Sequence, residues 1–423
     1  MLTLALLREK PDFVIEKLKV KNFDAYEIVN NILEQDKTRR QFQTELDNIL
    51  SLQKNKSREI GSMMKSGDND GAQAAKKEVI DLKIKSKDLE SNMQESEKKQ
   101  NELLVLLPNI PNEKVPNGKG EEDNLVIKQC GDIPDLGKDA LPHWELAAKY
   151  DLIDFDLGVK LTGAGFPVYK NRCAKFQRAL IQYFLDYNTE RGYMEIQPPI
   201  LVNENSGFGT GQLPDKEGQM YHCQVDNLYL VPTAEVPVTN IFRNVILDEK
   251  DLPVKLTAYT PCFRREAGSY GKDVRGLNRL HQFDKVEIVR ISHPDNSYKA
   301  LDEMVSHVEG LVQSLGLPYR ILRLCGGDLS FTSAITYDFE VYSEAQKRWL
   351  EVSSVSNFET FQSNRLKLRY NDEKGKKHLA HTLNGSSLAL PRIMAALMEN
   401  NQCADGIKVP EVLRSYTGFD ILK

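Results

Sequence analysis

The stretch from Phe263 to Glu287 carries residue types suited to handling phosphate groups. It reads FRREAGSYGKDVRGLNRLHQFDKVE, with a strand-like run that ends at Arg264 and a glycine-rich loop that follows. The planar guanidinium of arginine can contact a phosphate through two hydrogen bonds, and Gly268 and Gly271 would let the backbone approach a ligand closely. A hairpin that merely displays surface arginines is the alternative interpretation.

A second stretch, Ser386 to Asn400, reads SSLALPRIMAALMEN and predicts an apolar helix interrupted by one arginine, Arg392. A lone arginine on an apolar helix usually extends its charge to solvent or pairs with a carboxylate. The chain has no GxGxxG after a strand and no GxxxxGK[ST] motif. Any ATP site in this protein must therefore bind phosphates with side chains.

Short strand-like runs and helices must position these residues. A helix predicted at 298–315 places its apolar residues on one face, and Gly316 ends it. Strands that follow one another without intervening helices favour an antiparallel sheet with flanking helices, an α+β core, and exclude a doubly wound nucleotide fold. The predicted strands are Val254–Phe263, Val286–Ile291, Tyr319–Leu324, Tyr337–Tyr342 and Trp349–Val355.

The N-terminal part shows a heptad pattern. Apolar residues recur at alternating steps of four and three over 28–63, and the pattern restarts over 72–107 after a turn rich in Gly, Asp and Asn. This predicts a long antiparallel coiled-coil hairpin, on the order of 50 Å at 1.5 Å per residue. Prolines after Leu107 end the second helix, so we expect an N-terminal domain at 1–108 and a C-terminal domain at 109–423.

The charge of the predicted arm differs from that of the whole chain. The net charge of -5 gives no general signal for nucleic acid, so an RNA contact would need a local basic patch. Basic residues outnumber acidic ones around the tip of the hairpin, although a solvated coiled-coil face would look the same. The basic residues are Lys54, Lys56, Arg58, Lys65, Lys76, Lys77, Lys83, Lys85 and Lys87.

Cysteine usage and hydropathy indicate the compartment. The six cysteines form no CxxC pair and share no spacing with histidines, so we expect neither a disulfide framework nor a zinc site. No apolar run is long enough to cross a bilayer, and Met1 to Leu7 is too short for a signal sequence. A cytoplasmic protein with no membrane partner is the simplest expectation.

Together with Pro198-Pro199 after a helix, the two arginine stretches resemble the three signature motifs of class II aminoacyl-tRNA synthetases. Within that class, the chain resembles the seryl-tRNA synthetase family over essentially its whole length, coiled-coil arm included. The segments that carry the resemblance are TAE at 233–235, the run at 263–287, EVSSVSN at 351–357 and TLNGSSLALPR at 382–392.

The resemblance implies an ATP site. Arg264 would hold the α-phosphate and Glu266 the adenine, Phe283 would offer its ring to the base, and Arg392 would meet the γ-phosphate. Mg²⁺ would be the cofactor, held by Glu351 and Ser354. Packing in the core remains an alternative for Phe283. The full implied set is Arg264, Arg265, Glu266, Arg279, Phe283, Glu351, Val352, Ser353, Ser354 and Arg392.

The resemblance also implies a site for L-serine. A substrate ammonium needs carboxylate or amide acceptors, its carboxylate needs an arginine, and its hydroxyl needs a pair such as Glu287 with Ser386. Glu235 and Ser386 could instead cap the helices expected after them. The implied residues are Thr233, Glu235, Arg264, Glu287, Asn384 and Ser386.

The expected reaction is attack of the serine carboxylate on the α-phosphorus of ATP, then attack of a tRNA ribose hydroxyl on the acyl carbon. Catalysis would rest on positioning and on charge neutralisation by Arg264, Arg392 and magnesium. The resemblance further implies a homodimer that binds tRNA(Ser) across subunits through the arm, and charging of selenocysteine tRNA. A different class II synthetase, or an inactive RNA-binding paralogue, are the alternatives.

Overall fold

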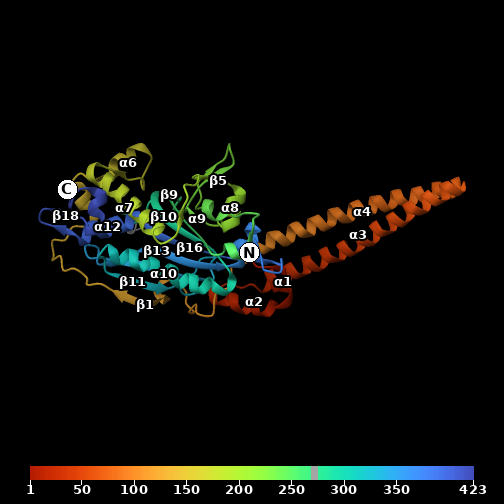
Figure 1. Cartoon of the computed structure of the whole chain (residues 1–423), viewed down its shortest axis with the longest axis horizontal. Coiled ribbons are helices and arrows are strands. Elements are labelled where there is room, and N and C mark those ends of the chain that lie inside the picture. The colour runs from red at the N-terminus through yellow and green to blue at the C-terminus, as the bar shows by residue number, and fades with distance from the viewer. Residues whose placement is uncertain (268–274) are drawn as a thin grey trace. The chain divides into compact units, whose positions relative to one another are not determined.

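The computed structural model describes residues 1–267 and 275–423, and the chain divides into two compact units (Figure 1). One unit comprises Leu2–Lys19 and Phe23–Pro108. The other comprises Met1, Val20–Asn22 and Asn109–Lys423. Apart from Met1 and Val20–Asn22, the boundary between the two units falls after Pro108.

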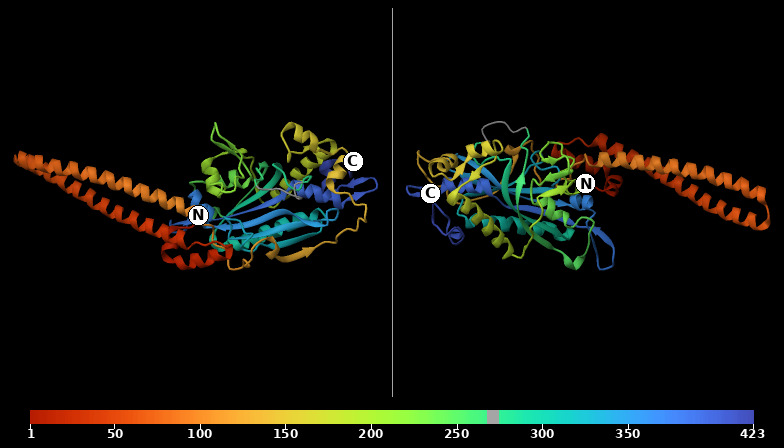
Figure 2. Two further views of the ribbon diagram at one scale, coloured as in Figure 1. Left: turned by 180° about the vertical axis from the view of Figure 1, so that it is seen from behind. Right: turned by 90° about the horizontal axis from the view of Figure 1, so that it is seen from above.

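The first unit is helical and confirms the predicted hairpin. Helices α3 (Tyr26–Ser66) and α4 (Asn69–Leu104) run side by side along their length (Figures 1 and 2), after the short helices α1 (Leu4–Glu9) and α2 (Pro11–Leu18). The turn between α3 and α4 is only two residues long. Gly67 ends α3 with a φ of 82°, where a side chain would be strained, and Asp68 accepts a hydrogen bond from the N–H of Gly71 to start α4.

A buried carboxylate stabilises the base of this hairpin. Asp36 on α3 is fully buried and accepts hydrogen bonds from Arg8 Nε at 2.7 Å and Arg40 Nε at 2.9 Å. Burial alone would raise the pKa of Asp36, but the hydrogen bonds of Arg8 and Gln100, with the charges of Arg8 and Arg40, outweigh it and hold that pKa below its usual value. A cross-helix contact from Gln100 Nε2 to the carbonyl of Ile32 lies close by in sequence.

The second unit is built on an eight-stranded sheet with the order β1-β11-β12-β13-β16-β10-β9-β4. All neighbouring strands are antiparallel except β4 and β9, which are parallel. The α+β architecture and the five predicted strands are thus confirmed. The strands are β1 (Leu125–Cys130), β4 (Met194–Glu195), β9 (Val254–Phe263), β10 (Gln282–Ser292), β11 (Tyr319–Arg323), β12 (Ile335–Ser343), β13 (Arg348–Glu359) and β16 (His381–Ala389).

Three helices cover one face of this sheet: α7 (Asn171–Thr189), α10 (Ser297–Ser314), close to the predicted helix, and α12 (Leu390–Asn400). Their apolar sides form one core cluster with alternate residues of the strands, such as Phe339 of β12. Because side chains alternate across a strand, Thr336 and Asp338 of β12 point to the opposite face. The polar face of the sheet is therefore the place for a site.

The predicted helix over Ser386–Asn400 is wrong in its first part. Residues 381–389 form β16, a central strand between β10 and β13, and α12 begins only at Leu390. The apolar run fits a buried strand as well as a helix, and Pro391 suits the first turn of α12, where its missing N–H costs nothing. Ser386 is consequently a strand residue and caps no helix.

No helix in the described part of the chain has the length and apolar character to cross a membrane. The remaining helices are α5 (His143–Lys149), α6 (Phe155–Leu161), α8 (Glu204–Thr210), α9 (Glu235–Asn240), α11 (Thr360–Leu366) and α13 (Glu411–Thr417). The remaining strands are β2 (Ile153–Asp154), β3 (Val168–Tyr169), β5 (Leu201–Asn203), β6 (His222–Cys223), β7 (Leu228–Leu230), β8 (Ile246–Asp248), β14 (Arg369–Asn371), β15 (Lys377–Leu379), β17 (Gln402–Cys403), β18 (Gly406–Lys408) and β19 (Ile421–Leu422).

Candidate active site

A cavity of about 340 Å³ lies on the polar face of the sheet. Every residue of the implied ATP set except Arg265 lines it. Arg265 is exposed, and its backbone N–H donates to the carbonyl of Gln219 at 2.8 Å. Gly268 and Gly271 of the glycine-rich loop lie outside the described residues. The lining residues include Arg264, Glu266, Arg279, Phe283, Lys285, Glu351, Val352, Ser353, Ser354, Ser386 and Arg392.

Arg264 and Phe283 reach the cavity from paired strands. Phe283 of β10 stands opposite Cys262 of β9, and Arg264 follows directly after β9. The guanidinium carbon of Arg264 lies 5.2 Å from the centre of the Phe283 ring, a cation–π distance. Phe283 is only partly buried, so its ring borders the cavity as well as the core.

Glu266 and Arg279 face each other across the root of the loop, where they form an ion pair. Glu266 lies shortly after the end of β9, and Arg279 lies shortly before the start of β10. Both line the cavity, and the Arg279 side chain is 41% exposed. A ligand entering here would therefore meet a guanidinium and a carboxylate that are already held in place.

A β-bulge brings Glu351 and Ser354 together. Residues three apart on a regular strand point to opposite faces, but the pairing of β13 with β12 shifts between Phe339 and Glu340. Glu351 then stands opposite Glu340, and Ser354 opposite Asp338, all on the polar face. Val352, within the bulge, packs in the core.

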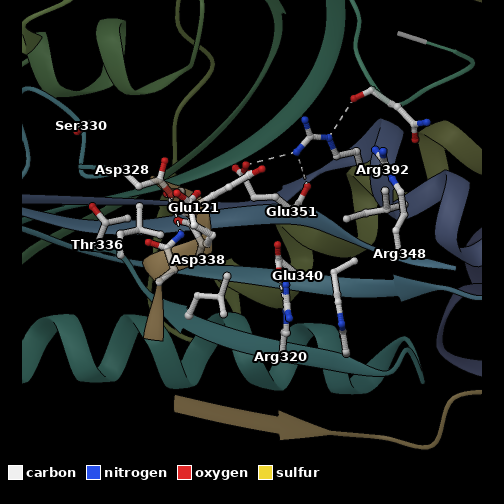
Figure 3. Close-up of a pocket in the computed structure, with 18 of the residues that line it drawn as sticks. Glu121, Arg320, Asp328, Ser330, Thr336, Asp338, Glu340, Arg348, Glu351 and Arg392 are labelled. Carbon is white, nitrogen blue, oxygen red and sulfur yellow. Dashed lines mark hydrogen bonds and ion pairs between the residues drawn. The ribbon is translucent and has the colours of Figure 1, made fainter. Parts of the chain in front are cut away.

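Arg392 enters from the first turn of α12. Its Nε donates to the carbonyl of Asn278 at 3.1 Å, and its Nη1 donates to the carbonyl of Glu351 at 2.9 Å and to Glu351 Oε2 at 3.4 Å (Figure 3). One third of the side chain remains exposed. The lone arginine thus touches a carboxylate, as one interpretation of the sequence held, but its charged end still lines the cavity.

A second cavity of about 870 Å³ adjoins the first and shares Asn278, Arg279, Glu351, Ser354 and Arg392 with it. It extends over β11, β12 and β13 and is lined by further charged residues. Figure 3 shows Arg348 and Arg392 on one side of Glu351, and Asp328 and Ser330 on the other. Its other charged residues are Glu121, Glu122, Arg320, Asp338 and Glu340.

Asp338 was missed by the sequence analysis. Its carboxylate accepts a hydrogen bond from Ser354 Oγ, and burial together with the nearby charge of Glu351 raises its pKa well above the usual value. The alternation of polar Thr336, Asp338 and Glu340 in a strand with an apolar face was the available signal.

A cluster of buried polar side chains adjoins the first cavity at Lys285 and Ser386, which both line that cavity. Glu287 stands opposite Ser386 across the β10–β16 pairing and forms an ion pair with Lys285 at 2.6 Å. Thr233 Oγ1 donates to Glu287 Oε2 at 3.3 Å. Lys285 was not among the site residues predicted from the sequence. The implied serine residues in this cluster, Thr233, Glu235, Glu287, Asn384 and Ser386, are all buried.

Glu235 is the first residue of α9, and its carboxylate does not cap that helix. Instead, Glu235 Oε1 accepts a hydrogen bond from Gln362 Nε2 at 2.6 Å. Burial, reinforced by the charge of Glu287, raises the pKa of Glu235 to about 7. The buried polar cluster thus holds two neighbouring carboxylates beside the ammonium of Lys285, an arrangement that favours a second cation.

Within residues 1–267 and 275–423, no group of three or more His, Cys, Asp or Glu residues is arranged to hold a metal ion. The residues nearest to such a role are oxygen donors on the polar face, Glu351, Ser354 and Asp338. This donor chemistry suits a hard cation that takes only one or two protein ligands beside phosphate oxygens.

Two family models match the chain in order. Residues 1–111 match the seryl-tRNA synthetase N-terminal domain, and residues 221–401 match the class II tRNA synthetase core domain for G, H, P, S and T. The serine–tRNA ligase of Salinibacter ruber is 51% identical, with 99% of this chain and 98% of that protein covered. The corresponding protein of a Hydrogenobaculum strain is 43% identical, with 98% and 99% covered.

Solved structures agree with these matches. The seryl-tRNA synthetase of Pyrococcus horikoshii, crystallised with ATP, superposes with a TM-score of 0.91 at 33% identity and 99% coverage of both chains. The cytoplasmic serine–tRNA ligase of Naegleria fowleri, in complex with AMP, gives a TM-score of 0.88 at 26% identity, with 100% of this chain and 99% of that one covered. With its arginine-lined cavity, its antiparallel sheet and its helical hairpin, the chain belongs to the seryl-tRNA synthetases, the serine–tRNA ligases of class II.

Proposed function

We propose that the two cavities and the buried polar cluster form one active site, which joins L-serine to ATP and then passes the seryl group to the 3′ end of tRNA(Ser). The observation that carries this assignment is the convergence of Arg264 and Arg392 on one cavity, whose lining residue Lys285 forms an ion pair with the buried Glu287 beside Glu235. A phosphate-binding end and a cation-binding end are what an amino acid and ATP require when they react together.

ATP occupies the cavity at the arginines. Phe283 stacks on the adenine, Glu266 accepts a hydrogen bond from the base, and Arg264 contacts the α-phosphate. Arg392 and Arg279 neutralise the outer phosphates. The exposure of the Arg392 and Arg279 side chains supports this assignment, because both cations are reachable by a ligand without rearrangement of the core. The P. horikoshii relative was crystallised with ATP, which supports nucleotide binding by this chain.

Magnesium fits the residues at Glu351 and Ser354. The Ser354 hydroxyl donates its hydrogen bond to Asp338, so the lone pairs of Ser354 Oγ can face a cation. One carboxylate and one hydroxyl, completed by phosphate oxygens and water, match the small number of protein ligands that Mg²⁺ takes. When bound there, the ion neutralises negative charge on the phosphates.

Serine binds at the buried polar cluster. Its ammonium lies at Glu235 and Asn384, with Thr233 beside them, its hydroxyl lies at Glu287 and Ser386, and its carboxylate faces Arg264. The pairing of Glu287 with Ser386 across β10 and β16 supports the hydroxyl assignment, because the two side chains emerge opposite each other. Glu287, Asn384 and Ser386 lie on strands of the sheet, and Arg264 directly follows β9.

The residues then act by positioning. An oxygen of the serine carboxylate attacks the α-phosphorus, the new O–P bond forms as the bond to the bridging oxygen breaks, and pyrophosphate leaves. Arg264 holds both the attacking carboxylate and the α-phosphate, while Arg392 holds the leaving group. In the second step the ribose hydroxyl attacks the acyl carbon and AMP leaves. The reaction requires no nucleophile from the protein.

The helical hairpin binds the tRNA in this proposal. Its basic residues near the turn are mostly exposed, and phosphate contacts from such a tip add salt-dependent affinity. We further propose a cytoplasmic homodimer that binds tRNA across its subunits and that also charges selenocysteine tRNA with serine. These finer features rest on the family resemblance.

Serine binding is expected to weaken as the pH falls below about 7. The ammonium of serine requires the ionised form of Glu235, whose pKa is raised to about 7 in the free protein. Below that pH the carboxyl takes up a proton that serine must displace, so the dissociation constant should rise about tenfold per pH unit. Calorimetry in buffers of different ionisation enthalpy should detect the released proton. A dissociation constant that is unchanged between about pH 6 and pH 8 would remove Glu235 from the ammonium site.

Glu287→Ala is expected to erode rejection of alanine more than rejection of threonine. Alanine is rejected because it leaves the hydroxyl partners unpaired, at about 1 to 3 kcal/mol per buried group, whereas the methyl of threonine is excluded by fit around Thr233 and Asn384. Activation of the three amino acids by wild type and variant should show the serine-to-alanine ratio falling by about ten- to a hundredfold. Glu287→Gln keeps a hydrogen-bonding group, so its serine-to-alanine ratio should lie between those of the wild type and Glu287→Ala. An unchanged ratio would show that Glu287 does not recognise the hydroxyl.

A further inference from the structure

A fully buried histidine and glutamate lie behind the ATP cavity and take no part in the proposed chemistry. His143, at the start of α5, and Glu399, near the end of α12, are both 0% exposed. His143 Nδ1 lies 2.6 Å from Glu399 Oε1, and the backbone N–H of His143 donates to the same oxygen at 2.8 Å. The pair joins two segments more than 250 residues apart in sequence.

The other side of the imidazole fixes its tautomer. The backbone N–H of Leu277 donates to His143 Nε2 at 2.8 Å, and a backbone amide can only donate. Nε2 must therefore be unprotonated, so the ring hydrogen is on Nδ1 and is donated to Glu399. Gly276, with a φ of 67°, lies against the same ring, where a Cβ would come within 2.2 Å of Nε2. The imidazole thus holds the 276–277 backbone at contact distance.

A second branch of this network reaches the nucleotide cavity. Gln346 Nε2 donates to Glu399 Oε1 at 2.9 Å, and Gln346 Oε1 accepts from Asn278 Nδ2 at 2.9 Å. The carbonyl of Asn278 in turn accepts from Arg392 Nε at 3.1 Å. Arg392 and Glu399 lie near opposite ends of α12, so the contacts through Gln346 and Asn278 connect the two ends of that helix.

From this geometry we infer that His143 is a positioning residue. Through Glu399 and Leu277 it fixes the backbone at 276–279. That backbone orients Arg392 and presents Arg279 for nucleotide binding. The inference rests on the proposed function in one respect, that Arg392 and Arg279 bind ATP. Neither His143 nor Glu399 lines either cavity, so they act through the backbone they hold. Loss of the Leu277 hydrogen bond should weaken ATP binding. It should leave serine binding unchanged, because the proposed serine residues lie on other elements.

His143→Asn tests this role, because asparagine keeps a donor near the Nδ1 position but cannot reach Leu277. ATP binding measured by calorimetry should weaken about tenfold, the order expected when one buried orienting hydrogen bond is lost. Serine binding without ATP should be unchanged. Gln402→Ala is the matched control: Gln402 joins the same two segments, through Leu141 and Glu399, but does not touch Leu277. It should lower the melting temperature and leave ATP binding as it is.

A double-mutant cycle separates a positioning role from a general loss of stability. If His143 acts through Arg392, His143→Asn should add little to the effect of Arg392→Ala on ATP binding, whereas independent effects would add. Should His143→Asn fold poorly, Gln346→Met interrupts the second branch and should show the same non-additivity. Additive effects, or equal losses of ATP and serine binding, would overturn the inference. If Arg392→Ala itself leaves ATP binding unchanged, the proposed ATP role of Arg392 fails instead.

Discussion

Arg392→Ala is expected to reduce serine-dependent ATP–pyrophosphate exchange by about 10²- to 10³-fold, the usual effect of removing one preorganised cationic group from a developing charge. The side chain lies in the first turn of α12, is one third exposed and is not part of the apolar core. Its removal should therefore cost little stability. What is lost is the cation facing the phosphates, together with the contacts that hold Glu351 and the Asn278 carbonyl.

Arg392→Lys is the informative companion. Lysine keeps the charge but cannot donate to Asn278, to Glu351 and to a phosphate at once, so its activity should lie between wild type and alanine. Arg414→Ala, at an exposed arginine on α13 whose Nε contacts the Val409 carbonyl, is a control for surface charge and should be near wild type. Exchange by Arg392→Ala at the wild-type rate would exclude a role for this residue in binding the phosphates.

Shortening the helical hairpin is expected to separate the two half-reactions. Removing residues 47–89 and joining the helices by a short glycine-rich turn should leave amino acid activation near wild type. Charging of tRNA should fall by on the order of a hundredfold or more, because the exposed cations of the tip are lost. The cut lies between two cross-helix contacts, Ile32 with Gln100 and Gln53 with Ser86, so the Asp36 cluster at the base is retained.

Charge reversal provides the matched control for that deletion. Replacing Lys76, Lys77 and Lys83 by glutamate keeps the hairpin at full length, and should weaken tRNA binding most at low salt, where phosphate contacts contribute most. Equal losses of activation and charging on shortening would contradict the independence of the two units. Charging that is indifferent to salt and to the reversed charges would make the tip an ordinary solvated surface.

Much of the architecture was predictable because the spacing of apolar residues along the sequence indicates helices and strands. The heptad spacing predicted α3 and α4, and the apolar strands predicted β9 to β13, since both patterns reflect a single buried face repeated over many residues. The stretch at 386–389, the end of β16, was mistaken for helix because a strand buried on both sides lacks alternation. Its neighbours β10 and β13, which decide the matter, are distant in sequence.

The site was harder to predict than the fold. Glu351 and Ser354 share a face only because of the bulge in β13, and no local pattern in the sequence reveals a bulge. Lys285 was overlooked because a lysine in a strand usually faces solvent, yet here it neutralises Glu287 at 7% exposure. Arg265 was included through the family resemblance, but it follows β9, is exposed and does not line the cavity.

Pyrophosphate exchange measured with each of the standard amino acids supplied singly tests the central claim most directly. Exchange requires an amino acid to react reversibly with ATP, so it reports on the first step alone and needs no tRNA. L-serine should support exchange well above every other amino acid, with alanine rejected for lack of a hydroxyl and threonine for its extra methyl. Exchange supported best by another amino acid, or by none, would contradict the assignment of the buried polar cluster at Glu235 and Glu287 to serine.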